Sequence, residues 1–293
     1  MNKLHEIKHD TTGALMYASK CYSLRDCVEA AVKDGANLAG ANLIGVNLNG
    51  ANLARANLAG AYIASAYLNG ANLAGANLIG VNLTGADLTD ADLIGANLAG
   101  ANIAGADLAG ANLASANLTG ADLTDADLTG ADLASAYLNG ANLARANLAG
   151  ADLAGANLAS ANLTGANLAS AYLTDANLAR ANLAGVYLNG ANLTGANLAR
   201  ANLAGACLTG TQIIDGGEDR RGYRFAGWRH QDGRVIYRAG CHEWDELSQA
   251  IEYYGESYDS TGDRQECLAR LKLIHTCAIQ RGWVSDERGA SDI

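Results

Sequence analysis

Cys241 and His242 are adjacent in the sequence, and a thiol beside an imidazole is the pair that activates a cysteine nucleophile. In an extended chain, however, neighbouring side chains point to opposite faces, so these two cannot form a direct dyad. We interpret the pair as a packed thiol beside a surface histidine. No other cluster indicates a reaction, so we expect no catalytic residue and no enzyme.

A zinc site is the second chemistry that the C-terminal residues could support. Cys267 and Cys277 lie ten residues apart on an expected helix, about 80° away from a common face. Together with His230, His242 and His275 they could supply ligands. The CxxC and HxxxH spacings typical of zinc sites are missing. We therefore expect neither a metal nor a cofactor.

A five-residue repeat must position most of the remaining side chains. From Ala36 the chain reads ANLAG-ANLIG-VNLNG-ANLAR, and Leu or Ile recurs at every fifth position from Leu38 to Leu208, in 35 units. Ile213 adds a degenerate further unit. A period of five fits neither a helix nor a strand, whereas short fixed periods are typical of solenoids. Each unit should turn its central leucine inward, with the small residue two positions earlier beside it.

Glycine marks the turns between these units. It occupies 23 of the 35 positions that lie second after the centre, where a type II turn needs a positive φ. The other 12 positions hold residues such as Arg55, Ser65 and Asp90, and we predict another turn type there. Proline, which would remove a donor needed between coils, is absent.

The A(N/D)Lxx pattern over residues 36–215 resembles the pentapeptide-repeat family. The resemblance implies a mainly β fold, a right-handed quadrilateral β-solenoid with four units, or about 20 residues, per coil. About nine such coils would form a rod roughly 43 Å long at the usual strand spacing of about 4.8 Å. In this family the side chain before each centre points outward.

With 20 residues per coil, the aspartates before the centres should stack. Residues twenty positions apart then share one outer face, which gives one ladder and a second ladder on the adjacent face, where Asn112 fills a gap. Carboxylates about 4.8 Å apart repel one another. Two interpretations remain open: the aspartates only add solubility, or they form a binding face for a basic partner. The six residues are Asp87, Asp107 and Asp127 in the first ladder and Asp92, Asp132 and Asp152 in the second.

Some pentapeptide-repeat proteins resemble B-DNA in size and charge and occupy the DNA site of type II topoisomerases such as gyrase. DNA would carry roughly 25 charges over a rod of this length. Residues 35–215 hold 4 Arg and 11 Asp, so the field of this rod is weaker. The gyrase-directed members also favour Phe at many centres, and none occurs here. A DNA-mimicking modulator of a topoisomerase is the alternative function.

The two ends should form caps, because open coils expose leucine and unpaired backbone. In residues 1–35 we predict strands at 5–9 and 14–19 around a turn, followed by a helix. Ser23 and Asp26 resemble a capping box, Leu24, Val28 and Val32 follow at helical spacing, and Gly35 stops the helix.

Residues 216–293 should form a small α+β domain. We predict a hairpin of strands 223–228 and 234–238 around Asp232-Gly233. Two helices should follow. The first has a helical stripe at Trp244, Leu247, Ile251, Tyr254 and Tyr258, of which Tyr258 is expected beyond the end of the helix. The second starts near Asp263 and has Leu268, Leu271, Ile274 and Ala278 inward. Rods with such ends are similar to uncharacterised phage and prophage pentapeptide-repeat proteins.

The distribution of charge along the chain indicates which classes of partner it can bind. The acidic rod should repel nucleic acid and phospholipid head groups, so we expect no direct nucleic-acid or membrane binding. The expected hairpin is basic instead, and its candidate partner-binding residues are Arg224, Arg229, Arg234 and Arg238, with solvated strand edges as the alternative. The N-terminus lacks an apolar signal core, and six scattered cysteines indicate reduced thiols. We therefore predict a cytoplasmic protein.

These observations favour a non-enzymatic structural and protein-interaction module. The rod would present flat faces to a protein partner, and the C-terminal domain would contact a partner or a second copy of the chain.

Overall fold

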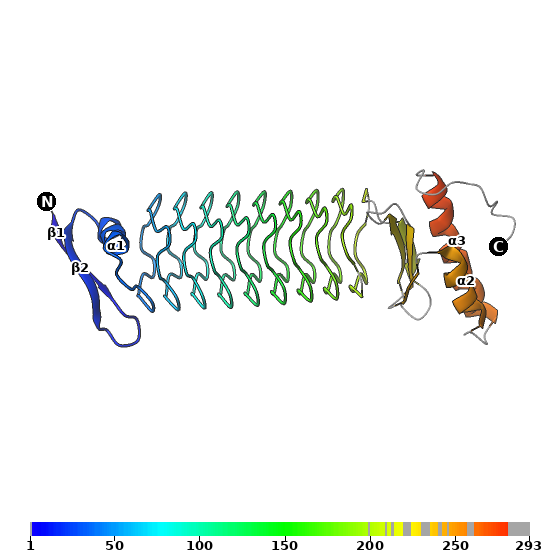
Figure 1. The fold of residues 1–293 in the computed structure, drawn as a ribbon, viewed down its shortest axis with the longest axis horizontal. Helices are drawn as coiled ribbons and strands as arrows, with labels where there is room; N and C mark the ends of the chain where they lie inside the picture. The colour runs from blue at the N-terminus through cyan, green and yellow to red at the C-terminus, as the bar shows by residue number, and fades with distance from the viewer. Residues whose placement is uncertain are drawn as a thin grey trace.

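The computed structural model describes residues 2–198, 200–208, 210–211, 214–218, 224–229, 235–239, 242–244, 246–256 and 261–280. Figure 1 shows three parts in a line: an N-terminal hairpin with a helix, a long stack of coils, and a C-terminal sheet with two helices. None of the described helices is long and apolar enough to cross a membrane.

The N-terminal cap is a hairpin covered by one helix. Strand β1 (Lys3–Lys8) pairs antiparallel with β2 (Leu15–Cys21), and the pairing extends two residues further toward the N-terminus than predicted. Helix α1 (Leu24–Lys33) starts with the predicted capping box: the Asp26 N–H donates to Ser23 Oγ, and the Ser23 N–H donates to Asp26 Oδ2. Gly35, at φ +71°, ends the helix as expected.

The cap holds the first coils through hydrogen bonds from both of its parts. The Asn42 side-chain amide donates to Asp10 Oδ1 over 2.7 Å. From α1, Arg25 Nη2 donates to the Gly50 carbonyl over 3.1 Å, and Glu29 Oε1 accepts from the Asn52 N–H over 2.7 Å. The first coils therefore meet a surface that satisfies backbone groups which a bare end would expose.

The solenoid has the predicted 20-residue coil. Parallel bridges join each outward residue to the residue twenty positions later, from Asn42↔Tyr62 to Tyr187↔Cys207. Inside the stack, the central leucines and the small residues two positions before them are buried in one continuous core, as Leu123 at 0% exposure and Ala121 at 1% illustrate. The five-residue rhythm thus sets which side chains face inward.

The repeat 121–125 shows why the sequence must take this form. The Ala121 N–H closes the turn onto the Leu118 carbonyl, and the N–H groups of residues 122, 123 and 125 donate to carbonyls of the coils before and after. The remaining amide, that of Thr124, donates to Asp122 Oδ1 over 3.0 Å. All five backbone donors are therefore used, and proline at any position of this unit would remove one.

The turn prediction for the twelve non-glycine positions is wrong. All twelve have φ between +54° and +60°, close to the values of the glycines at equivalent positions. The cause is the stack: the Arg55 N–H donates to the Ala74 carbonyl over 2.9 Å, just as the Gly60 N–H donates to the Ile79 carbonyl. Since the hydrogen bonds between coils fix one turn geometry, residues with a Cβ adopt a left-handed conformation that costs about 1–2 kcal/mol.

Serine and glycine should therefore differ in stability at the turn position. We expect Ser135→Gly to stabilise the protein by about 0.5–1 kcal/mol, because relief of the left-handed strain exceeds the entropy that glycine loses on folding. The reverse change, Gly130→Ser, is a matched control: Gly130 has φ +64°, and an added Cβ would meet no atom within 4 Å. It should destabilise by a similar amount in urea unfolding. If both substitutions changed the free energy of unfolding in the same direction, left-handed strain at the non-glycine turns would be contradicted.

The C-terminal part is a four-stranded antiparallel sheet with two helices, rather than the predicted hairpin with two helices. The strands β3 (Ile214–Glu218), β4 (Arg224–Arg229), β5 (Val235–Ala239) and β6 (His242–Trp244) lie in sequence order. Helices α2 (Leu247–Glu256) and α3 (Thr261–Gln280) follow. The pairing of β4 with β5 matches the predicted hairpin within one residue.

Two further predictions for this part need correction. Trp244 ends β6, where Tyr237 pairs with it, so it is not on the inward stripe of the first helix. Strand β3 begins at Ile214, inside the range that the repeat count assigned to the solenoid. On α3, Leu271, Ile274 and Ala278 are buried as expected. Tyr258, Ile213 and the turn at 232–233 lie outside the described residues.

The sheet stands at the end of the coils (Figure 1). Ile236 on β5 packs against the core of the solenoid, while Val235 and Tyr237 on either side of it belong to a second core with α2 and α3. This alternation is what one strand needs to face two cores. The C-terminal sheet therefore covers apolar residues of the final coils.

Candidate functional site

The outward position before each centre is built for an acceptor oxygen. At Asp107 and Asp132 this oxygen accepts the N–H two residues later, from Ala109 over 3.0 Å and Ala134 over 2.9 Å. Asparagine does the same, for example Asn97 with the Ala99 N–H at 3.2 Å. The turn needs one oxygen and no charge, so folding alone does not explain aspartate at this position.

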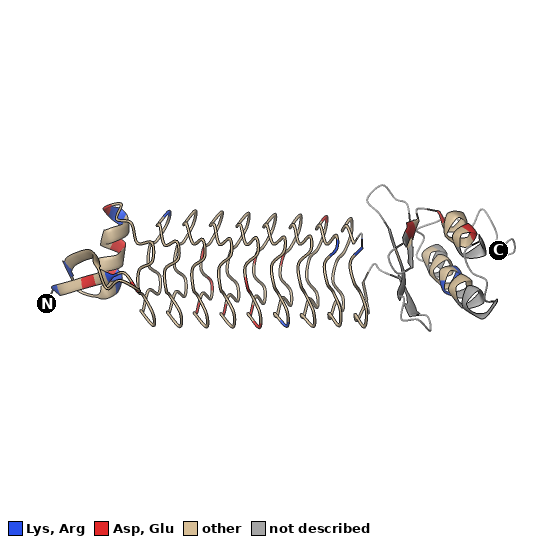
Figure 2. Ribbon diagram, turned by 90° about the horizontal axis from the view of Figure 1, so that it is seen from below, with Lys and Arg blue, Asp and Glu red and all other residues tan. Residues whose placement is uncertain are grey.

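The structure brings the six predicted aspartates together in two adjacent columns, which we name the acidic faces. In the first column, the bridges link Tyr67, Asp87, Asp107, Asp127 and Asn147 in turn. In the second, they link Asp92, Asn112, Asp132, Asp152 and Tyr172. Figure 2 shows acidic residues in the middle part of the rod. Exposed tyrosines thus adjoin the acidic stretches, Tyr67 at 52% and Tyr172 at 56% exposure.

Asp90 is a member of this surface that the sequence reasoning missed. It occupies the turn between the two columns, at φ +56°, and its side chain is exposed. The signal was available in the numbering, because Asp90 lies three residues after Asp87 and two before Asp92. With Asp90, the corner shared by the acidic faces is itself negative.

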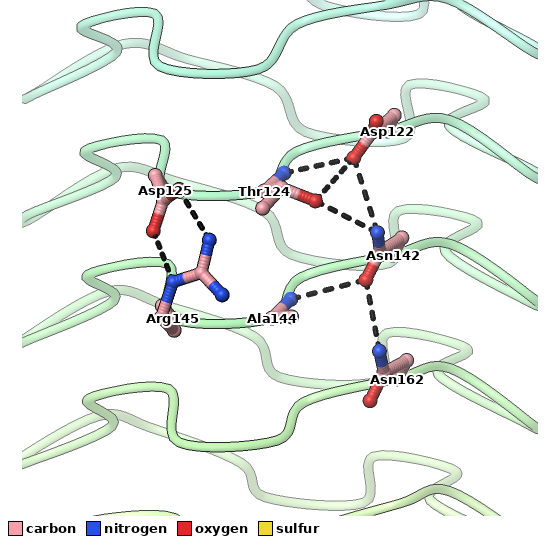
Figure 3. Close-up of polar contacts among 7 residues, drawn as sticks. All are labelled: Asp122, Thr124, Asp125, Asn142, Ala144, Arg145 and Asn162. Carbon is pink, nitrogen blue, oxygen red and sulfur yellow. Dashed lines mark hydrogen bonds and ion pairs between the residues drawn. The ribbon is translucent and has the colours of Figure 1, made fainter.

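Aspartate interrupts a ladder of side-chain amides. Where asparagines stack, each Nδ2 donates to the Oδ1 one coil earlier, as Asn162 does to Asn142 over 3.0 Å (Figure 3). Asn142 donates in turn to Asp122 Oδ1 over 3.2 Å, and there the ladder ends, because a carboxylate has no N–H. Stacked aspartates therefore lose the amide bond between coils and add repulsion.

A neutralised corner lies beside the first acidic column. Arg145 stacks one coil after Asp125 and binds it with two bonds, Nε–Oδ1 at 2.7 Å and Nη2–Oδ2 at 2.6 Å (Figure 3). Its guanidinium lowers the pKa of the Asp125 carboxyl, chiefly by hydrogen bonding, while desolvation acts in the opposite direction. This aspartate is satisfied by its own neighbour, so we leave it out of the acidic faces.

Two arginines give the rod a basic corner as well as its acidic faces. Arg180 and Arg200 occupy turn positions twenty residues apart and therefore share a corner with Gly80. With four corners per coil, that corner is two away from Asp90, on the diagonally opposite side. The acidic faces and this basic corner thus point in opposite directions.

The C-terminal candidates are placed only in part. Arg224 and Arg229 are at the two ends of β4, and Arg238 on β5 pairs with Ala226. Arg234 and Cys241 lie outside the described residues, and His242 starts β6. Cys267 is fully buried on α3. Within the described ranges, no group of three His, Cys, Asp or Glu side chains is arranged to hold a metal ion.

The coil geometry agrees with a comparison against protein families. The family model described as pentapeptide repeats matches the chain with eight copies in all. The matched stretches are residues 34–70, 56–95, 66–103, 96–133, 136–175 and 176–211. The chain belongs to the pentapeptide-repeat family. Pentapeptide-repeat proteins are right-handed β-helix solenoids, so this membership supports the solenoid expected from the repeat.

Three solved pentapeptide-repeat proteins illustrate the likeness. HetL, involved in heterocyst differentiation regulation in the cyanobacterium Nostoc, is 38% identical with a TM-score of 0.48, covering 60% of this chain and 84% of HetL. A thylakoid-lumen protein of Arabidopsis thaliana is 35% identical with a TM-score of 0.21, covering 40% and 68%. QnrB1, a plasmid-mediated fluoroquinolone resistance protein, is 21% identical with a TM-score of 0.38, covering 48% and 71%. A comparison with curated proteins gave no match.

Proposed function

We propose that this pentapeptide-repeat protein is a non-enzymatic interaction module, a stiff rod of about nine coils that binds a basic protein through its acidic faces. The observation that carries the proposal is the grouping of Asp87, Asp107 and Asp127 beside Asp92, Asp132 and Asp152, on two adjacent columns. Columns on the other two sides carry asparagine at nearly every coil, although the local turn accepts either residue.

The energetic cost of this grouping supports a role beyond solubility. Solubility would be served equally by aspartates scattered over four columns, where each could accept an amide bond from the next coil. Placing Asp107 directly after Asp87, and Asp152 after Asp132, instead stacks like charges at adjacent coils. Natural proteins accept such local destabilisation at sites that serve binding.

The shape of the surface favours a partner that presents several lysines or arginines across an extended contact. The carboxylates are repeated at the coil spacing of about 4.8 Å and are held by a rigid backbone, so little conformational entropy is lost on binding. Tyr67 and Tyr172 add exposed aromatic rings next to the acidic stretches, where they can pack on the stems of basic side chains.

The test is a sixfold change of Asp87, Asp92, Asp107, Asp127, Asp132 and Asp152 to Asn, which keeps every acceptor oxygen of the turns. The variant should fold with equal or higher thermal stability, since the amide ladder is completed. Binding of the protein that wild type captures from cells of its source should fall at least about tenfold in a titration at about 0.15 M salt. Unchanged affinity of the folded variant would refute the acidic faces as the binding site.

A second candidate function rests on the same surface. Acidic faces on a stiff rod could occupy the DNA site of a type II topoisomerase such as gyrase, or of another DNA-binding protein. The low net charge of the repeats, −7 over residues 35–215, weighs against it. A gyrase supercoiling assay tests this function. Inhibition by the wild-type protein that is absent with the sixfold Asn variant would support DNA mimicry. No inhibition at high micromolar protein would exclude mimicry toward gyrase.

The C-terminal domain completes the proposal as a second contact site. Its arginine-bearing strands would meet a protein partner or a second copy of the chain. The predicted division into 1–35, 36–215 and 216–293 then needs its second boundary moved ahead of β3 (Ile214–Glu218). We further propose a cytoplasmic location and a phage or prophage origin. Neighbouring phage structural or lysis genes would support that origin.

A further inference from the structure

The hairpin and the helix of the N-terminal cap each place one thiol on the side where they pack together. Cys21 is the last residue of β2, opposite Lys3 on β1. Cys27 lies in the second turn of α1, which packs on β2. Its side chain is fully buried, and its Sγ donates to the His5 carbonyl over 3.5 Å. Both cysteines are free thiols in the structure.

The register of β2 directs Cys21 toward the helix. Tyr17, Ser19 and Cys21 are partly buried, whereas the alternate residues Ala18 and Lys20 are exposed. Since successive strand residues point to opposite faces, Cys21 is on the covered face. Burial, and to a smaller extent the neighbouring Cys21 thiol, raise the pKa of Cys27, which places the two side chains within interaction range. Cys21 retains partial solvent exposure, so a small reagent can reach it.

We propose that Cys21 and Cys27 form a reversible intramolecular disulfide that fastens α1 to the hairpin and so locks the N-terminal cap. The pair requires a low-molecular-weight disulfide as oxidant, for which glutathione disulfide is the representative. The bond would close a loop of seven residues, from the end of β2 to the second turn of α1.

The reaction proceeds by two exchanges. The Cys21 thiolate attacks one sulfur of glutathione disulfide, whose S–S bond breaks; a mixed disulfide forms on Cys21, and one glutathione thiolate leaves and takes up a proton. Cys27 then gives its proton to water, and its thiolate attacks Cys21 Sγ, which releases the second glutathione. Two protein thiols are oxidised by two electrons, and one glutathione disulfide is reduced to two glutathiones.

Burial decides the order of these steps. It raises the pKa of the Cys27 thiol, so this residue is a poor first nucleophile. Cys27 is also covered completely by the hairpin and helix. Cys21 is therefore the residue that meets the oxidant, and Cys27 is the one that resolves the mixed disulfide from inside.

Locking the cap reaches the first coils through residues that flank Cys27. Arg25 holds the Gly50 carbonyl, and Glu29 holds the Asn52 N–H. If α1 is fastened to β2, these contacts open only when the whole cap detaches. Oxidation should therefore slow fraying of the solenoid from its N-terminal end.

Peptide mapping of the full-length protein tests the proposal. Trypsin cuts after Lys20 and Arg25, which separates the two cysteines into the peptides CYSLR and DCVEAAVK. After incubation with millimolar glutathione disulfide and blocking of free thiols, non-reducing mass spectrometry should show these peptides joined, two hydrogens lighter than their sum. Brief native proteolysis should cut after Lys20 and Arg25 about tenfold more slowly than in reduced protein.

Cys21→Ser is the control, because Cys21 is only partly buried and its loss should leave the cap folded. This variant should lose both the joined peptide and the oxidant-dependent protection. A stable glutathione adduct on Cys21 without the joined peptide, or links from Cys21 to other molecules only, would overturn the proposal. So would a joined peptide that leaves the rate of native proteolysis unchanged.

Discussion

Leu123→Asp is expected to abolish the continuous rod. Leu123 is completely buried, between Ile103 and Leu143 of the adjacent coils, and a carboxylate there would have no compensating partner. Removing the apolar side chain alone, as in Leu123→Ala, should cost about 2–5 kcal/mol, and burying a charge adds several more. Because each coil contacts only its neighbours, the defect should separate the stack into two parts that unfold independently.

Thermal and urea unfolding followed by circular dichroism check this result. Wild type should show a single cooperative loss of β signal from the solenoid, and Leu123→Asp a two-step loss or a greatly lowered midpoint. Asp122→Asn is the matched control at the neighbouring position: it keeps the acceptor oxygen that binds the Thr124 N–H, so its midpoint should change little. An unchanged midpoint for Leu123→Asp would contradict the inward placement of the centres.

Deletion of residues 93–102 should weaken binding to the basic partner without unfolding the rod. These ten residues carry no charge, and removing two repeats joins Asp92 to Ile103 with the five-residue rhythm intact. Everything downstream turns by half a coil. Asp87 and Asp92 stay in place, while Asp107, Asp127, Asp132 and Asp152 move together to the opposite faces, so the surface of six carboxylates divides into separate sets of two and four. We expect a loss of affinity of about tenfold or more, measured by titration.

Deletion of residues 76–85 is its matched control. It also removes ten uncharged residues and two repeats, but it precedes all six aspartates, so their mutual arrangement is kept. This variant should lose only the contribution of Tyr67, which turns half a coil away from Asp87, so it should bind much more tightly than the 93–102 deletion and keep the β-rich circular dichroism. If both deletions bind equally well, recognition does not require all six aspartates on one side of the rod, and the proposed six-residue surface is wrong.

The sequence predicted the solenoid closely because one rule governs every unit. A leucine at each fifth position and an acceptor before it are enough to specify the buried side and the outer columns, and the bridges follow them. The turn prediction failed for a non-local reason. Propensity disfavours Arg55 or Arg180 at positive φ, but the hydrogen bonds of adjacent coils impose the geometry of the glycine turns.

The candidate site was predictable to the level of columns, and the C-terminal part less so. Asp90 was missed because it occupies a turn, whereas the reasoning followed only the position before each centre. Trp244 has helical spacing to Leu247 and Ile251, but it lies in strand β6, where it pairs with Tyr237 on β5. Short segments of this kind are decided by partners that are distant in the sequence.

The use of all five amides within a repeat has a consequence for how such a protein can change. Along the sides of the rod no backbone N–H of such a repeat is left to donate, so a visiting molecule that needs a donor must use side chains there. The inward residues of each repeat maintain the architecture. The position before the centre tolerates Asn, Asp, Tyr or Cys, as at Asn142, Asp122, Tyr62 and Cys207. Selection can therefore rewrite the recognition surface one residue at a time, with little interference from the requirements of folding.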